Sequence, residues 1–490
     1  MSTQKSKFVE VGLTFDDVLL VPAYSEVLPS DVNLISKFSR NLPIKVPVVS
    51  AAMDTVTESK LAVALAREGG IGIIHKNLSI EEQCAEIDKV KRSESGMILD
   101  PVTIESSKSL EDALHIMSKY HISGVPVVDN GKLKGILTNR DIRFETNLGL
   151  RVSDRMTDNN LITVKEGTTL DEAKEVLQKH RVEKLLVIND SGALTGLITV
   201  KDILKKQNFP DAATDKHGRL LVGAAVGIDT NTPERVSELV NNNVDIIVID
   251  TAHGHSKSVM DMAKTIKKSH SNVDLIVGNI ASASAVESLI DCGADAVKVG
   301  IGSGSSCTTR IVAGVGVPQL SSIINAYEIA NKKNIPIISD GGMRYSGEIA
   351  KSLAAGSNAV MLGSIFAGTD ESPGEIILWE GRSYKTYRGM GSISAMKSGS
   401  SDRYFQKGTK NKKLVPEGIE GMVPVKGSLS ELVHQLLGGI RSSMGYCGAR
   451  TIKDFVKKVE FIKITSSGIV ESHPHDIDVT KEAPNYRKPY

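Results

Sequence analysis

Eight short apolar runs alternate along the chain with segments whose apolar residues recur at helical spacing, such as 59–68 and 233–241. A buried run followed by a helix, repeated many times, is typical of parallel strands joined by crossover helices. Eight such units predict a (β/α)8 barrel, the TIM barrel of the α/β class. The expected strands are residues 46–50, 71–74, 221–225, 245–250, 274–278, 295–299, 336–340 and 358–362.

Small and polar residues gather directly after the expected strands, in segments such as AAMD at 51–54, TAHGHS at 251–256 and GGMR at 341–344. The opposite strand ends carry ordinary solvated residues. Because active sites of (β/α)8 barrels lie at the carboxyl ends of the strands, the chemistry is expected on that face.

The segment KVGIGSGSSCTTR at 298–310 is the most distinctive of these strand ends. Its glycines, Gly300, Gly302 and Gly304, let the backbone turn and approach a bound group closely. Cys307 is expected at the exposed tip of a flexible loop, where nearby backbone dipoles favour the thiolate. Cysteines in general are more often small core residues, but the serines and threonines that flank Cys307 favour a nucleophile here.

Four further pieces on the same face could hold a phosphate group. They are Ser305, the segment 340–342 (DGG), the pair 363–364 (GS), and Tyr387 with the sequence YRGMGS. Backbone N–H groups and a short helix after the last two strands form the usual phosphate site of such barrels. That position makes the alternative, that these glycines only form turns, the weaker one.

Asp250 ends the fourth expected strand. It could cap a helix, but a carboxylate at this strand end favours a ligand for hydroxyl groups. His253 and His255 form an H-x-H pair, which is weak evidence for a metal site without further ligands, so polar loop contacts are expected.

An insertion separates the second and third expected strands and repeats internally. SLEDA at 109–113 recurs as TLDEA at 169–173, and GILTNRDI at 135–142 recurs as GLITVKDI at 196–203. Two copies of one unit normally pack together to complete a core. We therefore expect a barrel made from residues 1–95 and 208–490, with a module at 96–207 whose repeats span about 97–155 and 156–207.

A long segment after the eighth strand, about 381–427, is expected to be a mobile lid. Between 381 and 413 it holds nine Lys and Arg and one acidic residue, Asp402. A basic, glycine-rich lid over the barrel mouth suits an anionic, phosphorylated ligand. Residues 429–446 are predicted as a final helix.

Composition narrows the class of protein. The 490 residues carry a net charge of +1, with 40% hydrophobic and 24% charged residues, so several soluble domains are expected with no global attraction to nucleic acid. The four cysteines show no CxxC or zinc spacing, which favours a reducing cytoplasm. Neither an export signal nor an apolar run of membrane-spanning length is present. A Rossmann G-x-G-x-x-G after a strand and a P-loop are also absent, so a dinucleotide would lie across the barrel mouth.

Seven segments along the chain carry a joint resemblance to one family. They are GIGSGSSCTTR (300–310), SAAMDTVTE (50–58), VIDTAHGHS (248–256), SDGGMRYSG (339–347), YRGMGS (387–392), SSDRYFQ (400–406) and VPEGIEG (415–421). Together they resemble the bacterial inosine-5′-monophosphate (IMP) dehydrogenase family, and the resemblance covers nearly the whole chain. Two departures stand in the cysteine loop, where the family commonly has proline at the position of Ser303 and isoleucine at that of Ser306; they concern loop rigidity. The insertion resembles a pair of cystathionine-β-synthase-type (CBS) modules.

The resemblance implies oxidation of IMP to xanthosine 5′-monophosphate (XMP) by NAD⁺, the committed step of guanine nucleotide synthesis. The Cys307 thiolate adds to C2 of the purine, hydride leaves for NAD⁺, and a covalent thioimidate remains. The lid then closes, and Arg403 with Tyr404, assisted by Thr309, activates the water that releases XMP. Arginine is a poor base by its ordinary pKa, so a salt-bridging lid arginine is the competing interpretation.

Binding roles follow from the same resemblance. Glu417 would hold the purine edge and relay a proton through Thr309, while Asp250, Asn279, Gly300 and Gly302 would contact the cofactor NAD or a ribose. The IMP ribose and phosphate would be held by Ser305, Asp340, Gly341, Gly342, Gly363, Ser364, Tyr387, Gly389, Met390 and Gly391.

The family also implies an ion and an assembly. Potassium (K⁺) would sit among the carbonyls of Gly302, Gly304 and Cys307, which are suitable oxygen ligands. Ligands from a neighbouring subunit require a cyclic oligomer, a homotetramer in this family, with stacking into octamers left open. The neighbour would supply Glu471, Ser472 and His473.

In CBS modules a T-x-x-D element contacts the ribose of purine nucleotides. Here that element is Thr138 to Asp141 and Thr199 to Asp202, and a structural cap without a ligand is the alternative. Two rival functions remain at this point. GMP reductase, a deaminating NADPH enzyme, is expected to lack the insertion and the RYF lid. A nucleotide-sensing barrel without activity is disfavoured by the intact Cys307.

Overall fold

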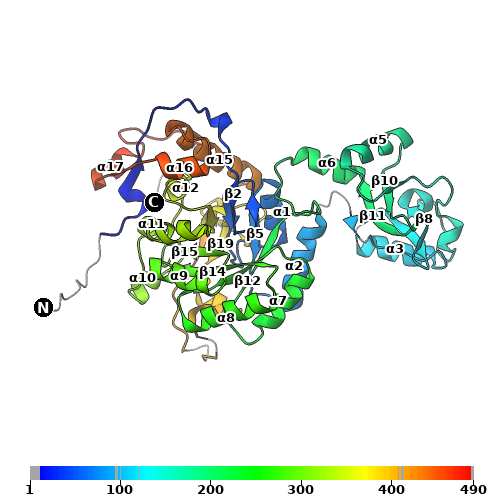
Figure 1. The fold of residues 1–490 in the computed structure, drawn as a ribbon, viewed down its shortest axis with the longest axis horizontal. Helices are drawn as coiled ribbons and strands as arrows, with labels where there is room; N and C mark the ends of the chain where they lie inside the picture. The colour runs from blue at the N-terminus through cyan, green and yellow to red at the C-terminus, as the bar shows by residue number, and fades with distance from the viewer. Residues whose placement is uncertain are drawn as a thin grey trace. The chain divides into compact units, whose positions relative to one another are not determined.

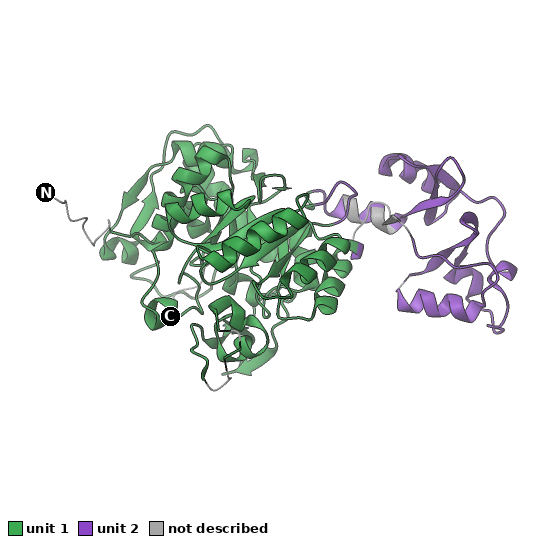
Figure 2. Cartoon of the chain, turned by 60° about the horizontal axis from the view of Figure 1, so that its bottom comes forward, with its two compact units in different colours: residues 1–91, 211–213, 220–490 green, residues 92–210, 214–219 purple. Residues whose placement is uncertain are grey.

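The computed structural model describes residues 11–486 except 94–97, 100, 121, 407 and 410–412. Only the backbone is described for residues 98–99, 201–202 and 205–206. The chain divides into two compact units, one of residues 1–91, 211–213 and 220–490, and one of residues 92–210 and 214–219 (Figure 2). No helix in the described ranges is long and apolar enough to cross a membrane.

Eight parallel strands of the first unit close a barrel, so the predicted (β/α)8 fold is confirmed (Figure 1). The strands coincide with the expected ones to within two residues, and β5 pairs directly with β12 across the insertion. Strand residues are buried on both faces, which explains their continuous apolar runs. In barrel order they are β12 (Val222–Val226), β13 (Ile246–Asp250), β14 (Asp274–Ile280), β15 (Ala296–Val299), β16 (Ile337–Asp340), β17 (Ala359–Leu362), β4 (Val48–Ser50) and β5 (Ile71–Ile74).

Amphipathic helices cover the outside of the barrel (Figure 1). In α1, for example, Leu61 and Leu65 are fully buried, one turn apart on the face toward the strands. The covering helices are α1 (Ser59–Arg67), α2 (Ile80–Ser93), α7 (Thr232–Asn241), α8 (Lys257–Ser269), α9 (Ala283–Asp291), α11 (Gln319–Ala330), α12 (Ser346–Ala354), α13 (Ser364–Ala367) and α15 (Leu429–Tyr446).

The helix predicted at 429–446 is confirmed as α15, but it is not the final one. Two short helices follow, α16 (Ile452–Lys458) and α17 (Ser466–Glu471). The sequence of α16, IKDFVKK, is too short and polar to show a helical period, yet its Ile452 and Phe455 are buried. Short strands tie the two chain ends and the N-terminal arm: β1 (Val18–Leu20) pairs with β21 (Phe461–Lys463), and β2 (Ser36–Lys37) with β3 (Pro43–Ile44).

The segment expected to be one long lid holds regular structure. Strands β18 (Ile376–Trp379), β19 (Arg382–Arg388) and β20 (Glu420–Pro424) form an antiparallel sheet, and α14 (Ile393–Lys397) and the 3₁₀ helix η5 (Ser400–Tyr404) lie between β19 and β20 in the chain. Lys385 is buried in this sheet, where its ammonium donates to the carbonyls of Thr369 (2.8 Å) and Ser372 (2.7 Å). Part of the basic charge counted in the sequence therefore satisfies the backbone and faces no ligand.

The second unit repeats one arrangement of elements, in which a helix is followed by a hairpin and a second helix. Each copy has its own apolar cluster, with Ala113, Met117 and Val125 in the first matched by Ala173, Leu177 and Leu185 in the second. The first copy holds α3 (Leu110–Lys119), β7 (Gly124–Asp129), β8 (Lys132–Thr138) and α4 (Asn139–Ile142); the second holds β9 (Thr163–Lys165), α5 (Leu170–His180), β10 (Lys184–Ile188), β11 (Leu194–Thr199) and α6 (Val200–Asn208), with β6 (Ile98–Leu99) paired to β11.

Candidate active site

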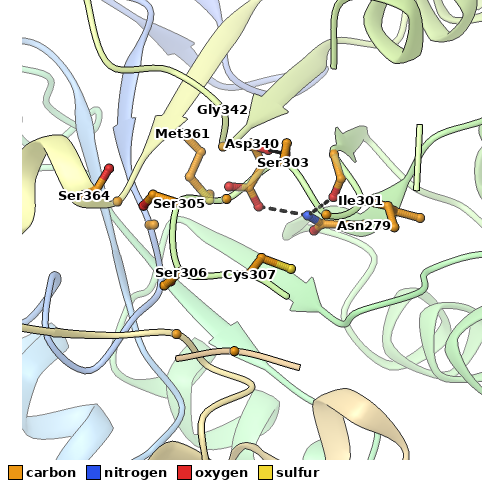
Figure 3. Close-up of a pocket in the computed structure, with 18 of the residues that line it drawn as sticks. Asn279, Ile301, Ser303, Ser305, Ser306, Cys307, Asp340, Gly342, Met361 and Ser364 are labelled. Atoms are coloured by element: carbon orange, nitrogen blue, oxygen red, sulfur yellow. Dashed lines mark hydrogen bonds between the residues drawn. The ribbon is translucent and has the colours of Figure 1, made fainter. Parts of the chain in front are cut away.

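One pocket at the carboxyl ends of the barrel strands collects the predicted site residues. All of those expected to be catalytic or to bind IMP or NAD line it, although they come from eight separate stretches of sequence. The expected ion ligands Glu471, Ser472 and His473 lie elsewhere in this chain, at and after the end of α17. In Figure 3, Ser305 and Ser364 stand at one end of the pocket, Asn279 at the other, and Cys307 between them.

The cysteine loop is tied to the lid segment and is not a free tip. The N–H of Thr308 donates to the carbonyl of Glu417 (2.9 Å), and the N–H of Ile419 donates to the carbonyl of Ser306 (2.9 Å). Cys307 is half-buried, and its thiol donates to the hydroxyl of Thr309 at 3.2 Å. The expectation of an exposed thiol on a flexible loop is wrong in this respect, because contacts far apart in sequence hold the loop.

Close approach between this loop and the end of β16 explains its glycines. A side chain at Gly300 would meet the carbonyl oxygen of Asp340 at 2.2 Å, and Gly302 has a φ of +74°. Ser303 adds a tether, since its hydroxyl donates to the same carbonyl (2.9 Å). Ser303 therefore anchors the cysteine loop to the end of β16 through a hydrogen bond.

The pieces expected at the phosphate converge at one end of the pocket. Gly341 has a φ of +83°, and a side chain there would lie 3.1 Å from the backbone nitrogen of Gly304. A side chain at Gly363 would lie 3.2 Å from the hydroxyl of Tyr387, and Ser305 donates to that hydroxyl at 3.4 Å. Burial raises the pKa of Tyr387, so it stays a neutral donor near pH 7. The arrangement offers hydroxyls and approachable backbone to an anion.

A buried lysine that the sequence analysis did not single out joins the carboxylates of the pocket. The ammonium of Lys298, on β15, lies 2.8 Å from Asp250 and also contacts Asp340 and the side-chain oxygen of Asn279. Asn279 in turn donates to Asp340 (3.0 Å) and to the carbonyl of Gly300 (2.7 Å) (Figure 3). A lysine inside the apolar run AVKVG was the available signal, but its partners lie on three other strands.

The lid is docked into the pocket through Arg403. Its guanidinium pairs with the Asp250 carboxylate, and its carbonyl accepts the N–H of Ala252 (3.1 Å). Burial alone lowers the pKa of Arg403, but Asp250 and Tyr404 outweigh it, so the net shift is upward. Burial likewise raises the pKa of Asp250, and Arg403 and Lys298 reverse that shift. In this conformation Arg403 is a salt-bridging cation, the competing interpretation from the sequence.

A second ion pair holds the same lid turn. Asp402 pairs with Lys76, which follows β5, and both side chains are at least nine-tenths buried. The hydroxyl of Ser400 donates to the carbonyl of Met390 (2.5 Å). The single acidic residue counted in the basic lid is therefore a docking contact, a role that composition did not reveal.

His253 and His255 make ordinary loop contacts. Their rings lie edge to face, and His255 Nε2 is 3.1 Å from the hydroxyl of Ser288. In the part of the chain that the structure describes, no three His, Cys, Asp or Glu side chains are grouped as metal ligands.

The T-x-x-D element of the first repeat is satisfied locally. Both the N–H and the hydroxyl of Thr138 donate to Asp141 at 2.7 Å, as in a capping box at the start of α4. In the second repeat Thr199 ends β11, and the side chain of Asp202 lies outside the described part of the chain. Nucleotide binding there stays a prediction.

Comparison with known proteins adds sequence and fold relatives. A family profile for the IMP dehydrogenase / GMP reductase domain matches residues 12–475. Inosine-5′-monophosphate dehydrogenases of Halalkalibacterium halodurans, Bacillus subtilis and Aquifex aeolicus are 56%, 55% and 57% identical over 98% of this chain and 98–99% of their own. The crystal structure of a GMP reductase from Trypanosoma brucei, in complex with guanosine 5′-monophosphate, matches with a TM-score of 0.87 and 39% identity over 96% of this chain and 99% of its own.

The last match corrects one expectation. GMP reductase was expected to lack the insertion, yet the matched enzyme covers far more of this chain than the barrel unit alone. The insertion therefore does not separate the two activities, and the discrimination falls to sequence identity. Taken with the full-length similarity to the bacterial enzymes, the match shows that the chain belongs to the IMP dehydrogenase / GMP reductase family.

Proposed function

We propose that this protein oxidises IMP to XMP with NAD⁺, in the pathway to guanine nucleotides. The observation that carries the proposal is the position of Cys307, between a hydroxyl- and glycine-lined end and a carboxylate-lined end of one pocket. Near-complete alignment with bacterial IMP dehydrogenases at 55–57% identity supports the choice of substrate.

The chemistry balances as IMP + NAD⁺ + H₂O giving XMP + NADH + H⁺. The Cys307 sulfur forms a bond to C2 of the purine, and the hydride on C2 leaves for NAD⁺. Water then adds to C2, the carbon–sulfur bond breaks, and the thiol is restored. Thr309, already hydrogen-bonded to the sulfur at 3.2 Å, is placed to carry a proton in this exchange.

The substrates are assigned to opposite ends of the pocket. The IMP phosphate lies at Ser305, the 341–342 and 363–364 backbones, and Tyr387, with Asp340 on the ribose and residues 389–391 and Glu417 along the purine. NAD⁺ lies toward Asp250, Asn279 and the backbone of Gly300 and Gly302. In this structure Arg403 pairs with Asp250, which is assigned to NAD⁺. The docked lid therefore corresponds to the hydrolytic half of the cycle, after NADH has left.

A K⁺ ion and a homotetramer belong to the same proposal. Gly302, with its positive φ, turns the loop so that neighbouring carbonyl oxygens can face one point, and oxygen donors suit a hard cation. These carbonyls fit such an ion in part, and Glu471, Ser472 and His473 of a neighbouring copy would complete it. When bound, the ion would hold the cysteine loop in shape. Purine nucleotides at the insertion are proposed as regulatory ligands.

Absorbance at 340 nm tests the reaction directly. With IMP and NAD⁺ the full-length protein should produce NADH, and replacing K⁺ by Na⁺ should slow it. GMP with NADPH serves as the comparison, since the T. brucei enzyme of similar fold is a GMP reductase. NADPH consumption with GMP, without NADH formation from IMP, would show that the rival activity is the right one.

A further inference from the structure

The buried ion cluster at the barrel mouth has an uneven charge count. Asp250 and Asp340 are carboxylates with 10% and 18% of their side chains exposed, and Lys298, at 1%, contacts both. With both carboxyl groups ionised, the three residues carry one net negative charge. Arg403 of the docked lid, at 13% exposed, brings the count to zero.

The strands are built to admit this lysine. Lys298 is in register with Gly278 on β14, and a side chain at 278 would lie 2.6 Å from the Lys298 Cβ. Glycine therefore leaves the volume that the lysine stem fills. Asn279, the next residue, accepts from the ammonium and donates to Asp340, so the amide holds both charged groups in one orientation.

The net charge of this cluster is energetically important because burial removes its charged groups from water. An ion buried without a partner is strongly unfavourable, so a cluster with one net charge attracts whichever cation can reach it. In the open state Arg403 is withdrawn and Asp250 has one carboxylate oxygen to offer. The proposed position of NAD⁺ brings a cationic nicotinamide ring to the same place.

This inference rests on the proposed function. We propose that Lys298 is a positioning residue that keeps this cluster at one net negative charge. The nicotinamide of NAD⁺ neutralises that charge first, and Arg403 neutralises it after hydride transfer. Hydride transfer makes the nicotinamide ring neutral. The product then loses its attraction to the cluster, and the lid arginine replaces it. The loss of positive charge from NAD⁺ to NADH thereby sets the order of hydride transfer and hydrolysis.

Binding measurements test the charge count without turnover. Dissociation constants for NAD⁺ and NADH are measured by calorimetry on Cys307→Ala protein saturated with IMP. The expected result is that NAD⁺ binds roughly tenfold more tightly than NADH, in the range of ordinary coupling between two ligands. Adding Arg403→Ala removes the competing cation, so both affinities should rise by a similar factor and the preference for NAD⁺ over NADH should remain.

Two substitutions at Lys298 separate charge from packing. Lys298→Gln raises the net charge to two negatives and should widen the preference for NAD⁺, whereas Lys298→Arg keeps the charge and should preserve it. Exchange of the Ala252 amide proton, which is bonded to the Arg403 carbonyl, reports lid docking and should slow in Lys298→Gln without ligand. The Gly254 amide, bonded to Asn279 within the barrel (2.7 Å), is the matched reference.

Equal affinities for NAD⁺ and NADH in every variant would overturn the proposal, as would a Lys298→Arg protein that behaves like Lys298→Gln. If Lys298→Gln does not fold, the Arg403→Ala comparison decides the matter alone. Wild-type turnover is measured in parallel. If the wild type forms NADH but the variants bind NAD⁺ no more tightly than NADH, this inference alone is overturned. If the wild type forms no NADH, the proposed function is overturned.

Discussion

The barrel mouth and the inserted unit both place charged pairs near the ends of strands, but they differ in burial. In the inserted unit Arg140 pairs with Glu183, and both side chains are more than two-thirds exposed. At the barrel mouth Lys298, Asp250 and Arg403 are almost withdrawn from water. Exposed pairs contribute about 0–1 kcal/mol, whereas breaking a buried pair costs about 3–5 kcal/mol.

This difference indicates where charge serves function. Charged groups in the inserted unit can satisfy residues close by in the sequence, as Asp141 does for Thr138. Charges at the barrel mouth satisfy one another across three strands and a lid, and they depend on each partner being in place. Substitutions at the mouth should therefore change catalysis strongly, and substitutions in the inserted unit should change it little.

The largest effect is expected from Cys307→Ala. NADH formation should fall by on the order of 10³-fold or more, because the covalent route is lost. Mass spectrometry of the wild type with IMP and NAD⁺ should find an adduct on the peptide that carries Cys307. Cys292→Ala, in a buried cysteine outside the pocket, is the control and should keep near-normal turnover. Undiminished turnover in Cys307→Ala would remove the covalent mechanism.

Arg403→Ala should slow steady turnover roughly 10²-fold, because the docked lid loses its buried ion pair with Asp250. The first burst of NADH should stay nearly intact, since hydride transfer precedes lid docking. Rapid-mixing absorbance at 340 nm measures both phases. Lys397→Ala removes an exposed cation of the same lid and should change neither. A burst that falls together with the steady rate would assign Arg403 to substrate binding.

Lys76→Met should slow steady turnover by roughly tenfold, because it leaves Asp402 buried without its partner and weakens docking of the lid. The burst should again be kept. Combining Lys76→Met with Asp402→Asn removes both charges and should restore part of the loss. If steady turnover in the double variant falls by more than the product of the two single-variant reductions, the Lys76–Asp402 pair does not hold the lid in its docked position.

Deleting residues 96–207, with a short Gly-Ser linker, should keep turnover within about twofold, because domain removal is tolerated where the core is not cut. Purine nucleotides such as ATP and GTP should change the IMP response or assembly of the full chain and leave the deletion variant unaffected. Calorimetry with the full-length protein checks binding. Loss of catalysis on deletion would show that the inserted unit supports the barrel.

The smallest effect on catalysis is expected from Asp141→Ala. It removes the partner of Thr138 and should lower the stability of the inserted unit by about 1 kcal/mol. Turnover without added nucleotide should be unchanged. Thermal unfolding and the nucleotide response are measured side by side, and Glu172→Ala, in the capping box that begins α5 outside the T-x-x-D elements, is the control. A changed basal rate would contradict the separation of roles.

The barrel was predictable because each strand and helix carries its own local pattern. Residues 246–249, for example, are apolar on both faces and are followed at once by a polar cluster. The site residues in glycine- and serine-rich strand ends were found for the same reason. Lys298 was missed because its partners come from three other strands, and no local pattern records them. Docking of Asp402 on Lys76 spans 326 residues and was equally invisible.

Closure of the barrel has a consequence for the order in which the molecule assembles. Strand β4 pairs with β17, as in Val48 with Val360, so the ring cannot close until most of the chain has been synthesised. The hairpin β10–β11 pairs locally and can form much earlier. We expect the inserted unit to fold first on the ribosome, while β4 and β5 keep open outer edges. Those two strands are then the part of the nascent chain most exposed to aggregation.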